Sequence, residues 1–297
     1  MPPIETEASA SDRAFVLLQR MLPTHAMSRV VHWFMRLRIA FIKNLLIRLL
    51  MRGYGISLDE AITQDVGDFG SFNEFFTRAL KPAVRPLPAE SGRVVSPVDG
   101  RVYEAGEIED GRIFQAKGHS FSAAELLGGD PARAALFYGG HFATIYLAPN
   151  NYHRIHMPLA GTLREMVYVP GRLFSVNPAT TRALPNLFAR NERVAALFHT
   201  EAGPMAMVLV GALFVGSIEA IWAGEITPPR GSRVVTTRYM ADSPSAVRLA
   251  QGAEMGRFNM GSTVILLFGR KALSWSAQLL PGAPLLMGQE IARLEKM

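Results

Sequence analysis

The pattern of apolar and turn-forming residues changes at Val94, and this change constrains the fold more than any other feature. From there to the C-terminus, short runs rich in valine, isoleucine, phenylalanine and tyrosine alternate with glycine, proline and asparagine turns. That spacing is typical of a compact β domain. The stretch 206–218 is too short to span a membrane and predicts further buried strands. The clearest other runs are 100–103, 142–147, 166–169, 194–198 and 234–235.

The region before this β body is basic and apolar. Residues 13–58 contain eight lysines and arginines and no acidic residue, whereas the whole chain carries a net charge of +6. The rest of the chain is therefore slightly acidic. The cations are interleaved with bulky apolar side chains such as Trp33 and Phe41. This pattern favours an anionic membrane surface as the partner, and not nucleic acid.

Within this region we expect a helix from about Ser28 to Arg52, capped by Ser28 and ended by Gly53. A membrane span needs about 20 largely uncharged apolar residues. Charges interrupt every window of that length, at Arg36, Arg38, Lys43 and Arg48. We therefore expect the helix to lie in the membrane interface. The alternative is a core helix whose arginines are solvated.

The sequence predicts three parts. Residues 1–12 are expected to be disordered, 13–58 to form basic amphipathic helices broken at Pro23, and 59–297 to form the β-rich domain. Before the first strand, a short helix capped by Ser71 and a stiff proline-rich linker over 81–88 are expected. A further helix is expected over 122–127. The fold class is α+β, mainly β.

One candidate for chemistry is Gly261-Ser262-Thr263, which runs directly into the apolar stretch 264–268. Gly261 has no side chain to shield its carbonyl, and the next residue carries a hydroxyl. Backbone strain at such a turn could favour attack of that hydroxyl on the preceding carbonyl. The chain would then cut itself between Gly261 and Ser262. The tripeptide alone also describes an ordinary turn.

Two other polar clusters could support this chemistry. One contains Asp99, in Ser-Pro-Val-Asp-Gly, and the other contains His153 and His156, three residues apart. In one scheme Asp99 orients His156, which takes the proton from the Ser262 hydroxyl. The alternatives are an ordinary Asp-Gly turn and a surface loop of histidines. No metal is expected, because cysteine is absent and no third ligand has suitable spacing.

Several motifs, in this order along the chain, resemble bacterial phosphatidylserine decarboxylases, a family of pyruvoyl-dependent proenzymes. The resemblance runs from about Ser71 to the C-terminus. Met260 departs from it, since the family usually has leucine there, but the two side chains are similar in volume and we expect cleavage to survive. The motifs are Ser-Phe-Asn-Glu-Phe-Phe (71–76), Ser-Pro-Val-Asp-Gly (96–100), Gln-Ala-Lys-Gly-His (115–119), Tyr-His-Arg-Ile-His-Met-Pro (152–158), Phe-Ser-Val-Asn-Pro (174–178), Asn-Glu-Arg (191–193) and Met-Gly-Ser-Thr (260–263).

The resemblance implies self-cleavage between Gly261 and Ser262 into a β chain, 1–261, and an α chain, 262–297. Ser262 becomes a covalent pyruvoyl cofactor that forms a Schiff base with phosphatidylserine, releasing CO2 and phosphatidylethanolamine in phospholipid biosynthesis. His156 and Asp99 form the charge relay of self-cleavage, and Thr263 or nearby amides stabilise the oxyanion. His153 is the candidate proton donor or substrate contact.

The resemblance also implies a barrel-sandwich-like β body with N-terminal amphipathic helices. We expect a peripheral protein on the cytoplasmic face of the cell membrane, bound to anionic phospholipid. The two chains should form a heterodimer after cleavage, and the family suggests a homodimer of such pairs.

Three other functions remain open on the sequence. A serine hydrolase using Asp99, His156 and Ser262 would keep one intact chain. A non-enzymatic module for binding membrane surfaces would tolerate loss of the Ser262 hydroxyl. A pyruvoyl decarboxylase for a soluble amino acid would have no need of the basic segment 13–58.

Overall fold

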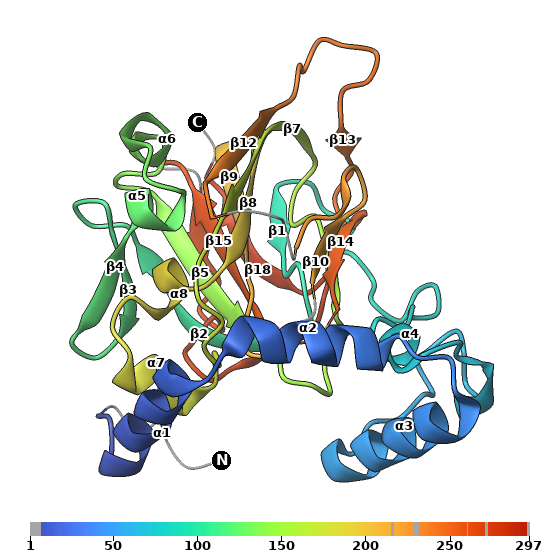
Figure 1. Cartoon of the computed structure of the whole chain (residues 1–297). Coiled ribbons are helices and arrows are strands. Elements are labelled where there is room, and N and C mark those ends of the chain that lie inside the picture. The colour runs from blue at the N-terminus through green and yellow to red at the C-terminus, as the bar shows by residue number, and fades with distance from the viewer. Residues whose placement is uncertain (1–6, 215–216, 228–231, 260, 271–272, 296–297) are drawn as a thin grey trace.

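The computed structural model describes residues 7–214, 217–227, 232–259, 261–270 and 273–295. Within them, packed β-sheets form the body of the molecule, and the first three helices run along one side of it (Figure 1). The expected class, α+β and mainly β, is confirmed.

The largest sheet has nine strands, and its neighbouring strands are antiparallel. Among the described strands no ladder joins its two edges, β12 and β17, so the sheet stays open and the body is a sandwich without a closed barrel. In spatial order its strands are β12 (Val235–Arg238), β7 (Gly161–Val169), β8 (Arg193–Thr200), β9 (Gly203–Val210), β15 (Thr263–Phe268), β5 (His141–Tyr146), β2 (Gly100–Glu107) and β17 (Pro284–Leu285), with β13 (Arg248–Leu249) paired to β7.

Three smaller sheets complete the body. One contains β11 (Gly224–Glu225), β10 (Ile218–Ala220), β14 (Glu254–Phe258) and β6 (Arg154–His156). Another contains β1 (Arg93–Val95), β18 (Glu290–Leu294) and β16 (Leu273–Trp275), and the last is the hairpin of β3 (Arg112–Ala116) and β4 (His119–Ser122). The predicted runs correspond to β2, β5, β7, β8 and β12, and the stretch 206–218 contains most of β9 and the start of β10.

Strand β15 lies at the centre of the core. Its side chains alternate between the two faces of the sheet, as in any strand. Val264, Leu266 and Phe268 pack toward the smaller sheets, whereas Ile265 and Leu267 pack toward the opposite layer. That layer includes the β3–β4 hairpin and three short helices: α5 (Ala123–Leu126), α7 (Pro178–Ala183) and α8 (Leu187–Arg190). Helix α6 (Pro131–Ala135) packs against α5. Helix α5 confirms the helix expected over 122–127, and Ser122 caps it.

The N-terminal helices correct two expectations. Helix α1 (Ala10–Met21) begins within the segment expected to be disordered, because Ser9 caps it and Asp12 forms an ion pair with Arg182. Residues 1–6 lie outside the described residues. The single helix expected over 28–52 is two helices, α2 (Thr24–Met35) and α3 (Ala40–Tyr54), with a tight turn at Arg36 between them.

The expected caps of that helix also differ. The Ser28 hydroxyl lies inside α2 and accepts a hydrogen bond from the Phe214 N–H at 3.2 Å. Helix α3 continues through Gly53 and ends at Gly55, whose φ of 63° is in the left-handed region. Glycine adopts that C-terminal conformation at no steric cost, so the second of the two glycines ends the helix.

Helix α3 packs on a small aromatic cluster separate from the cores of the body. Ile47 contacts side chains from α4 (Phe72–Phe76) and from the loop around the 3-10 helix η1 (Val66–Asp68). Lys43 is buried beneath this loop, and its ammonium group donates to the carbonyls of Val66 (3.2 Å), Gly67 (3.0 Å) and Phe69. Ser71 caps α4, as predicted.

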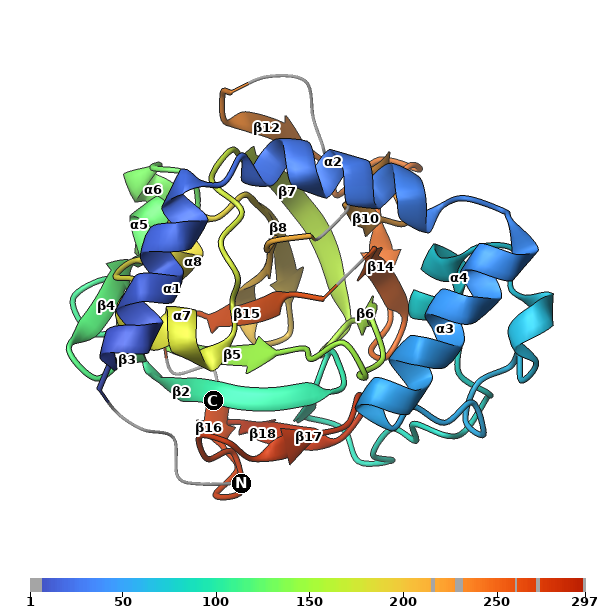
Figure 2. The same cartoon turned by 60° about the horizontal axis from the view of Figure 1, so that its bottom comes forward.

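The three N-terminal helices surround one side of the β body. Figure 2 looks onto that side and shows α1, α2 and α3 around its edge, with β15, β5 and β6 between them. Within the described part of the chain, no helix combines the length and the apolar character that crossing a bilayer requires.

Candidate active site

The segment between β14 and β15 carries the predicted cleavage site. Ser262 and Thr263 are fully buried where β15 enters the large sheet, and the Ser262 carbonyl accepts a hydrogen bond from the Leu147 N–H at 2.9 Å. Among the described residues, the hydroxyls of Ser262 and Thr263 have no hydrogen-bond partner. Buried polar atoms usually find partners, so two unpartnered hydroxyls on consecutive residues make this segment a candidate functional site. Met260 lies outside the described residues.

The space around Gly261 is tight. A Cβ atom at this position would lie 3.3 Å from the Leu147 carbonyl oxygen and 3.4 Å from Nε2 of His153. Glycine therefore allows an imidazole to approach the backbone directly before Ser262.

His153 is the histidine beside this backbone. It is fully buried, and its Nδ1 lies 2.8 Å from the Asn151 carbonyl oxygen, so Nδ1 carries the proton. Its Nε2 has no hydrogen-bond partner in the described part of the chain. Burial lowers the pKa of His153 to about 3, and the positive charge of Arg78 acts in the same direction. The ring is therefore a neutral imidazole with a free lone pair, packed against Phe76 at a centroid distance of 4.0 Å.

His156 has a different environment. Its Nδ1 donates to the Gly252 carbonyl at 2.8 Å, and its Nε2 accepts from the Tyr152 hydroxyl at 2.9 Å. Burial also lowers the pKa of His156. Both ring nitrogens are therefore occupied by partners other than Asp99 and Ser262.

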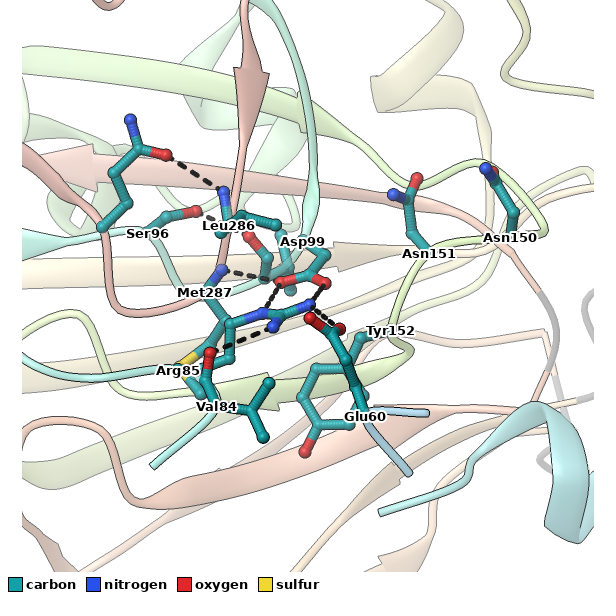
Figure 3. Close-up of polar contacts among 12 residues, drawn as sticks. Glu60, Val84, Arg85, Ser96, Asp99, Asn150, Asn151, Tyr152, Leu286 and Met287 are labelled. Atoms are coloured by element: carbon teal, nitrogen blue, oxygen red, sulfur yellow. Dashed lines mark hydrogen bonds and ion pairs between the residues drawn. The ribbon is translucent and has the colours of Figure 1, made fainter. Parts of the chain in front are cut away.

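Asp99 belongs to a buried ion-pair network (Figure 3). Arg85 binds both of its carboxylate oxygens, from Nε at 3.0 Å and from Nη2 at 2.6 Å, and the Met287 N–H donates to the same carboxylate at 2.8 Å. Arg85 also pairs with Glu60 at 2.8 Å. Together these contacts, with burial as an opposing effect, raise the pKa of Arg85 above its usual value. The proline-rich linker expected over 81–88 thus anchors a carboxylate as well as joining two parts of the chain.

The structure therefore brings together only some of the predicted site residues. His153, Gly261 and Ser262 are neighbours. Among these fully described side chains, no hydrogen bond joins Asp99 to His156 or His156 to Ser262. The Asp99–His156–Ser262 relay stays a prediction.

A cavity of about 280 Å³ opens beside Gly261. Helices α3 and α4 form one wall, and strand β5 and the loops at 175–177 and 212–214 form the others. Its lining is mainly apolar with a few polar groups, which is the usual character of a small-molecule site. The residues that line it from the helices, from β5 and from the position directly after β5 are Leu50, Tyr54, Phe72, Phe76, Tyr146 and Leu147.

Comparison with known proteins shows the family of this chain. The family model described as phosphatidylserine decarboxylase matches residues 72–293, and a second model, described as PSD, matches residues 14–55. The chain belongs to the phosphatidylserine decarboxylase family. Among its relatives in this family are proteins named phosphatidylserine decarboxylase proenzyme. That of Ectopseudomonas mendocina (strain ymp) is 54% identical over 277 residues, which cover 93% of this chain and 96% of the relative. That of Stutzerimonas stutzeri (strain A1501) is 54% identical over 282 residues, 95% of each chain.

The structure adds residues that the sequence analysis does not name as part of a site. The sequence places Arg85 only in a proline-rich linker, whereas the structure pairs it with Asp99. The sequence predicts Phe76 only as part of a short amphipathic helix. Its contact with His153 depends on how α4 packs beside the residue that precedes β6, which no local pattern predicts.

Proposed function

We propose that this chain is a phosphatidylserine decarboxylase proenzyme that cuts itself between Gly261 and Ser262 and then converts phosphatidylserine to phosphatidylethanolamine and CO2. The observation that carries the proposal is the buried, unpartnered Ser262 hydroxyl at a glycine that the free Nε2 of His153 approaches. A neutral imidazole beside the glycine that directly precedes a buried serine is suited to acyl transfer at that glycine.

In the first step, the Ser262 hydroxyl attacks the Gly261 carbonyl carbon, and the peptide C–N bond is replaced by an ester. A base then removes the α-proton of residue 262, the ester C–O bond breaks, and Gly261 leaves as a new C-terminal carboxylate. Water converts the remaining dehydroalanine to a pyruvoyl group and ammonia. The structure contains Ser262 as an intact serine and therefore represents the precursor.

Two histidines compete for the role of base. The sequence assigns it to His156 with Asp99 as its orienter. The geometry supports His153, because its Nε2 is free and lies beside Gly261, whereas both nitrogens of His156 are engaged. Burial keeps His153 neutral at physiological pH, so it can accept a proton without first losing one.

The residues around position 262 fit a pyruvoyl group. A pyruvoyl group supplies an electrophilic carbonyl that accepts the electron pair released when CO2 leaves. The Leu147 N–H holds the backbone carbonyl of residue 262, and the Thr263 hydroxyl is free to donate to a nearby oxygen. His153 can return a proton to the product at the same place. The apolar wall from α3 and α4 keeps bulk water away from these transfers.

The N-terminal helices support a lipid substrate. Large apolar side chains on α1, α2 and α3 are exposed to solvent, including Leu17, Met21, Val30, Trp33, Phe41 and Leu49. Exposed arginines occur on the same three helices: Arg13, Arg20, Arg29, Arg48 and Arg52. Exposed apolar groups beside cations favour the surface of an anionic bilayer. We propose that these helices bind the cytoplasmic face of the cell membrane peripherally, which places the cavity near the lipid headgroups.

The two chains are expected to stay together after cleavage. Strand β15, which begins the 262–297 chain, is paired on one side with β9 and on the other with β5. Its six residues are all buried. Dissociation would therefore require unfolding of the large sheet.

The proposal is tested with purified protein and vesicles that contain phosphatidylserine. Wild-type protein should convert phosphatidylserine to phosphatidylethanolamine, measured by lipid mass spectrometry. The Ser262→Ala variant should remain a single chain and produce none. Production of phosphatidylethanolamine by the Ser262→Ala variant would contradict the proposal. A fully cleaved wild-type sample that produces no phosphatidylethanolamine would contradict it as well.

A further inference from the structure

Helix α4 touches the candidate site at three places. Phe76 packs on the ring of His153, and Phe72 and Phe76 line the cavity. From the same helix, the Asn73 side chain reaches the segment that carries the cleavage site, where its Nδ2 donates to Oδ1 of Asn259 at 3.0 Å. The first two contacts belong to the site already described, whereas the third does not.

Asn259 is held from two sides. Its own Nδ2 donates to the Ser217 hydroxyl, and its backbone N–H donates to the Ser217 carbonyl at 3.0 Å. Asn73 occupies the remaining end of the side-chain amide. Asn259 is only 2% exposed, so these bonds are shielded from water. A buried amide that is hydrogen-bonded at both its oxygen and its nitrogen limits the movement of the backbone that carries it.

The bond to be cut lies between two anchors. Asn259 is anchored two residues before Gly261, and the Ser262 carbonyl is anchored by the Leu147 N–H at 2.9 Å. Attack on the Gly261 carbonyl requires the hydroxyl and the carbonyl carbon to meet at a defined distance and angle. An anchor on each side limits the freedom of this carbonyl.

We propose that Asn73 is a positioning residue for self-cleavage, acting through Asn259 on the peptide between Gly261 and Ser262. This inference rests on the proposed function. It also makes α4 a link between the wall of the substrate cavity and the maturation of the enzyme. Once the bond is cut, Asn259 and residue 262 belong to different chains, so the influence of Asn73 on the reacting atoms ends.

The test follows conversion of newly synthesised full-length chain into its two products over time. Asn73→Ala and Asn259→Ala should each slow the first-order rate by about tenfold, the equivalent of one lost hydrogen bond. The double variant should be no slower than the slower single variant, because both substitutions remove the same contact. Ser217→Ala, which releases Asn259 from its other side, should also be slow.

Glu74→Gln is the matched control, because Glu74 lies on the same helix but its carboxylate accepts from the Gly70 N–H. It should cleave at the wild-type rate. After maturation is complete, kcat and KM of the Asn73→Ala enzyme for phosphatidylserine should equal those of the wild type, which a general loss of structure would not allow.

Wild-type cleavage rates in Asn73→Ala and Ser217→Ala would overturn this inference while leaving the proposed function intact. If the two single-variant rate losses multiply in the Asn73→Ala/Asn259→Ala double variant, the inference is also overturned. The same holds if kcat of the matured Asn73→Ala enzyme falls by as large a factor as its cleavage rate. Absence of cleavage in the wild type itself would instead refute the proposed function.

Discussion

Replacing His153 by glutamine is the perturbation that separates the two candidate bases. Glutamine is polar and similar in size, and its amide can still donate toward the Asn151 carbonyl that now accepts from Nδ1. It has no basic lone pair at the position of Nε2, which faces Gly261. The substitution therefore removes the chemistry of the imidazole while retaining most of its packing.

The expected loss is large. A positioned general base contributes roughly 10²- to 10⁴-fold to a rate, so His153→Gln should slow self-cleavage by that factor. The structure also predicts the pH profile. With a pKa of about 3 for His153, roughly one ring in a hundred is protonated at pH 5, and fewer at higher pH. Titration of this group should therefore leave the wild-type cleavage rate flat between pH 5 and pH 8.

The assay uses cell-free synthesis followed by electrophoresis of the precursor and its products at timed intervals. His156→Gln is the comparison, because it removes the partner of Tyr152 and Gly252 without touching Gly261. It should slow cleavage by less than His153→Gln does. His199→Gln, at an exposed position of β8, is the control for a histidine substitution elsewhere.

The opposite order would refute this reasoning. If His153→Gln cleaves at the wild-type rate and His156→Gln is blocked, the Asp99–His156–Ser262 relay is the working arrangement. In that case the precursor must rearrange so that His156 exchanges its present hydrogen bonds for new ones.

Three further predictions concern stability and membrane binding. Arg85→Ala leaves the buried Asp99 carboxylate without its cation and should lower the free energy of unfolding by roughly 3–5 kcal/mol, measured by chemical denaturation. A free energy of unfolding equal to that of the wild type would contradict the stabilising role of this ion pair. Trp33→Ser should weaken sedimentation with phosphatidylserine vesicles by about tenfold or more, because it removes an apolar side chain that would be buried in the bilayer. Leu280→Ser, exposed outside the N-terminal helices, should bind normally, and equal binding by both variants would argue against the helices as the membrane contact. His153 is buried as a neutral ring, whereas its pKa in the unfolded chain is about 6.5. The free energy of unfolding should therefore be unaffected by this group above pH 6.5 and should fall by about 1.4 kcal/mol per pH unit as the pH drops from 6.5 toward 3. An equally steep acid dependence in His153→Gln would contradict that assignment.

Local patterns in the sequence predicted a large part of the fold. Short apolar runs located β2, β5, β7 and β8, and the capping serine Ser71 located α4, because these signals depend on neighbouring residues alone. The helix expected over 122–127 corresponds to α5. The break between α2 and α3 was missed, since the apolar pattern continues through 36–39 without a proline or glycine. Its position is set by tertiary contacts, including the burial of Lys43 under the loop at 66–69.

The candidate site was predicted by residue type and in part by role. Gly261, Ser262 and the histidine pair were all recognised, but the spacing of three residues could not tell which imidazole faces the backbone. His153 and His156 lie on either side of the start of β6, and the path of that strand decides which one meets Gly261. Arg85 lies 14 residues before Asp99, and only the folded chain brings them together.

Intact-mass spectrometry of the purified protein tests the central claim most directly. The account predicts two species, residues 1–261 ending in a free carboxylate and residues 262–297 lighter by one ammonia than a plain hydrolysis product. That deficit distinguishes a pyruvoyl terminus from a cut made by a contaminating protease. A single unmodified chain of 32.6 kDa, in a preparation that decarboxylates phosphatidylserine, would contradict the account.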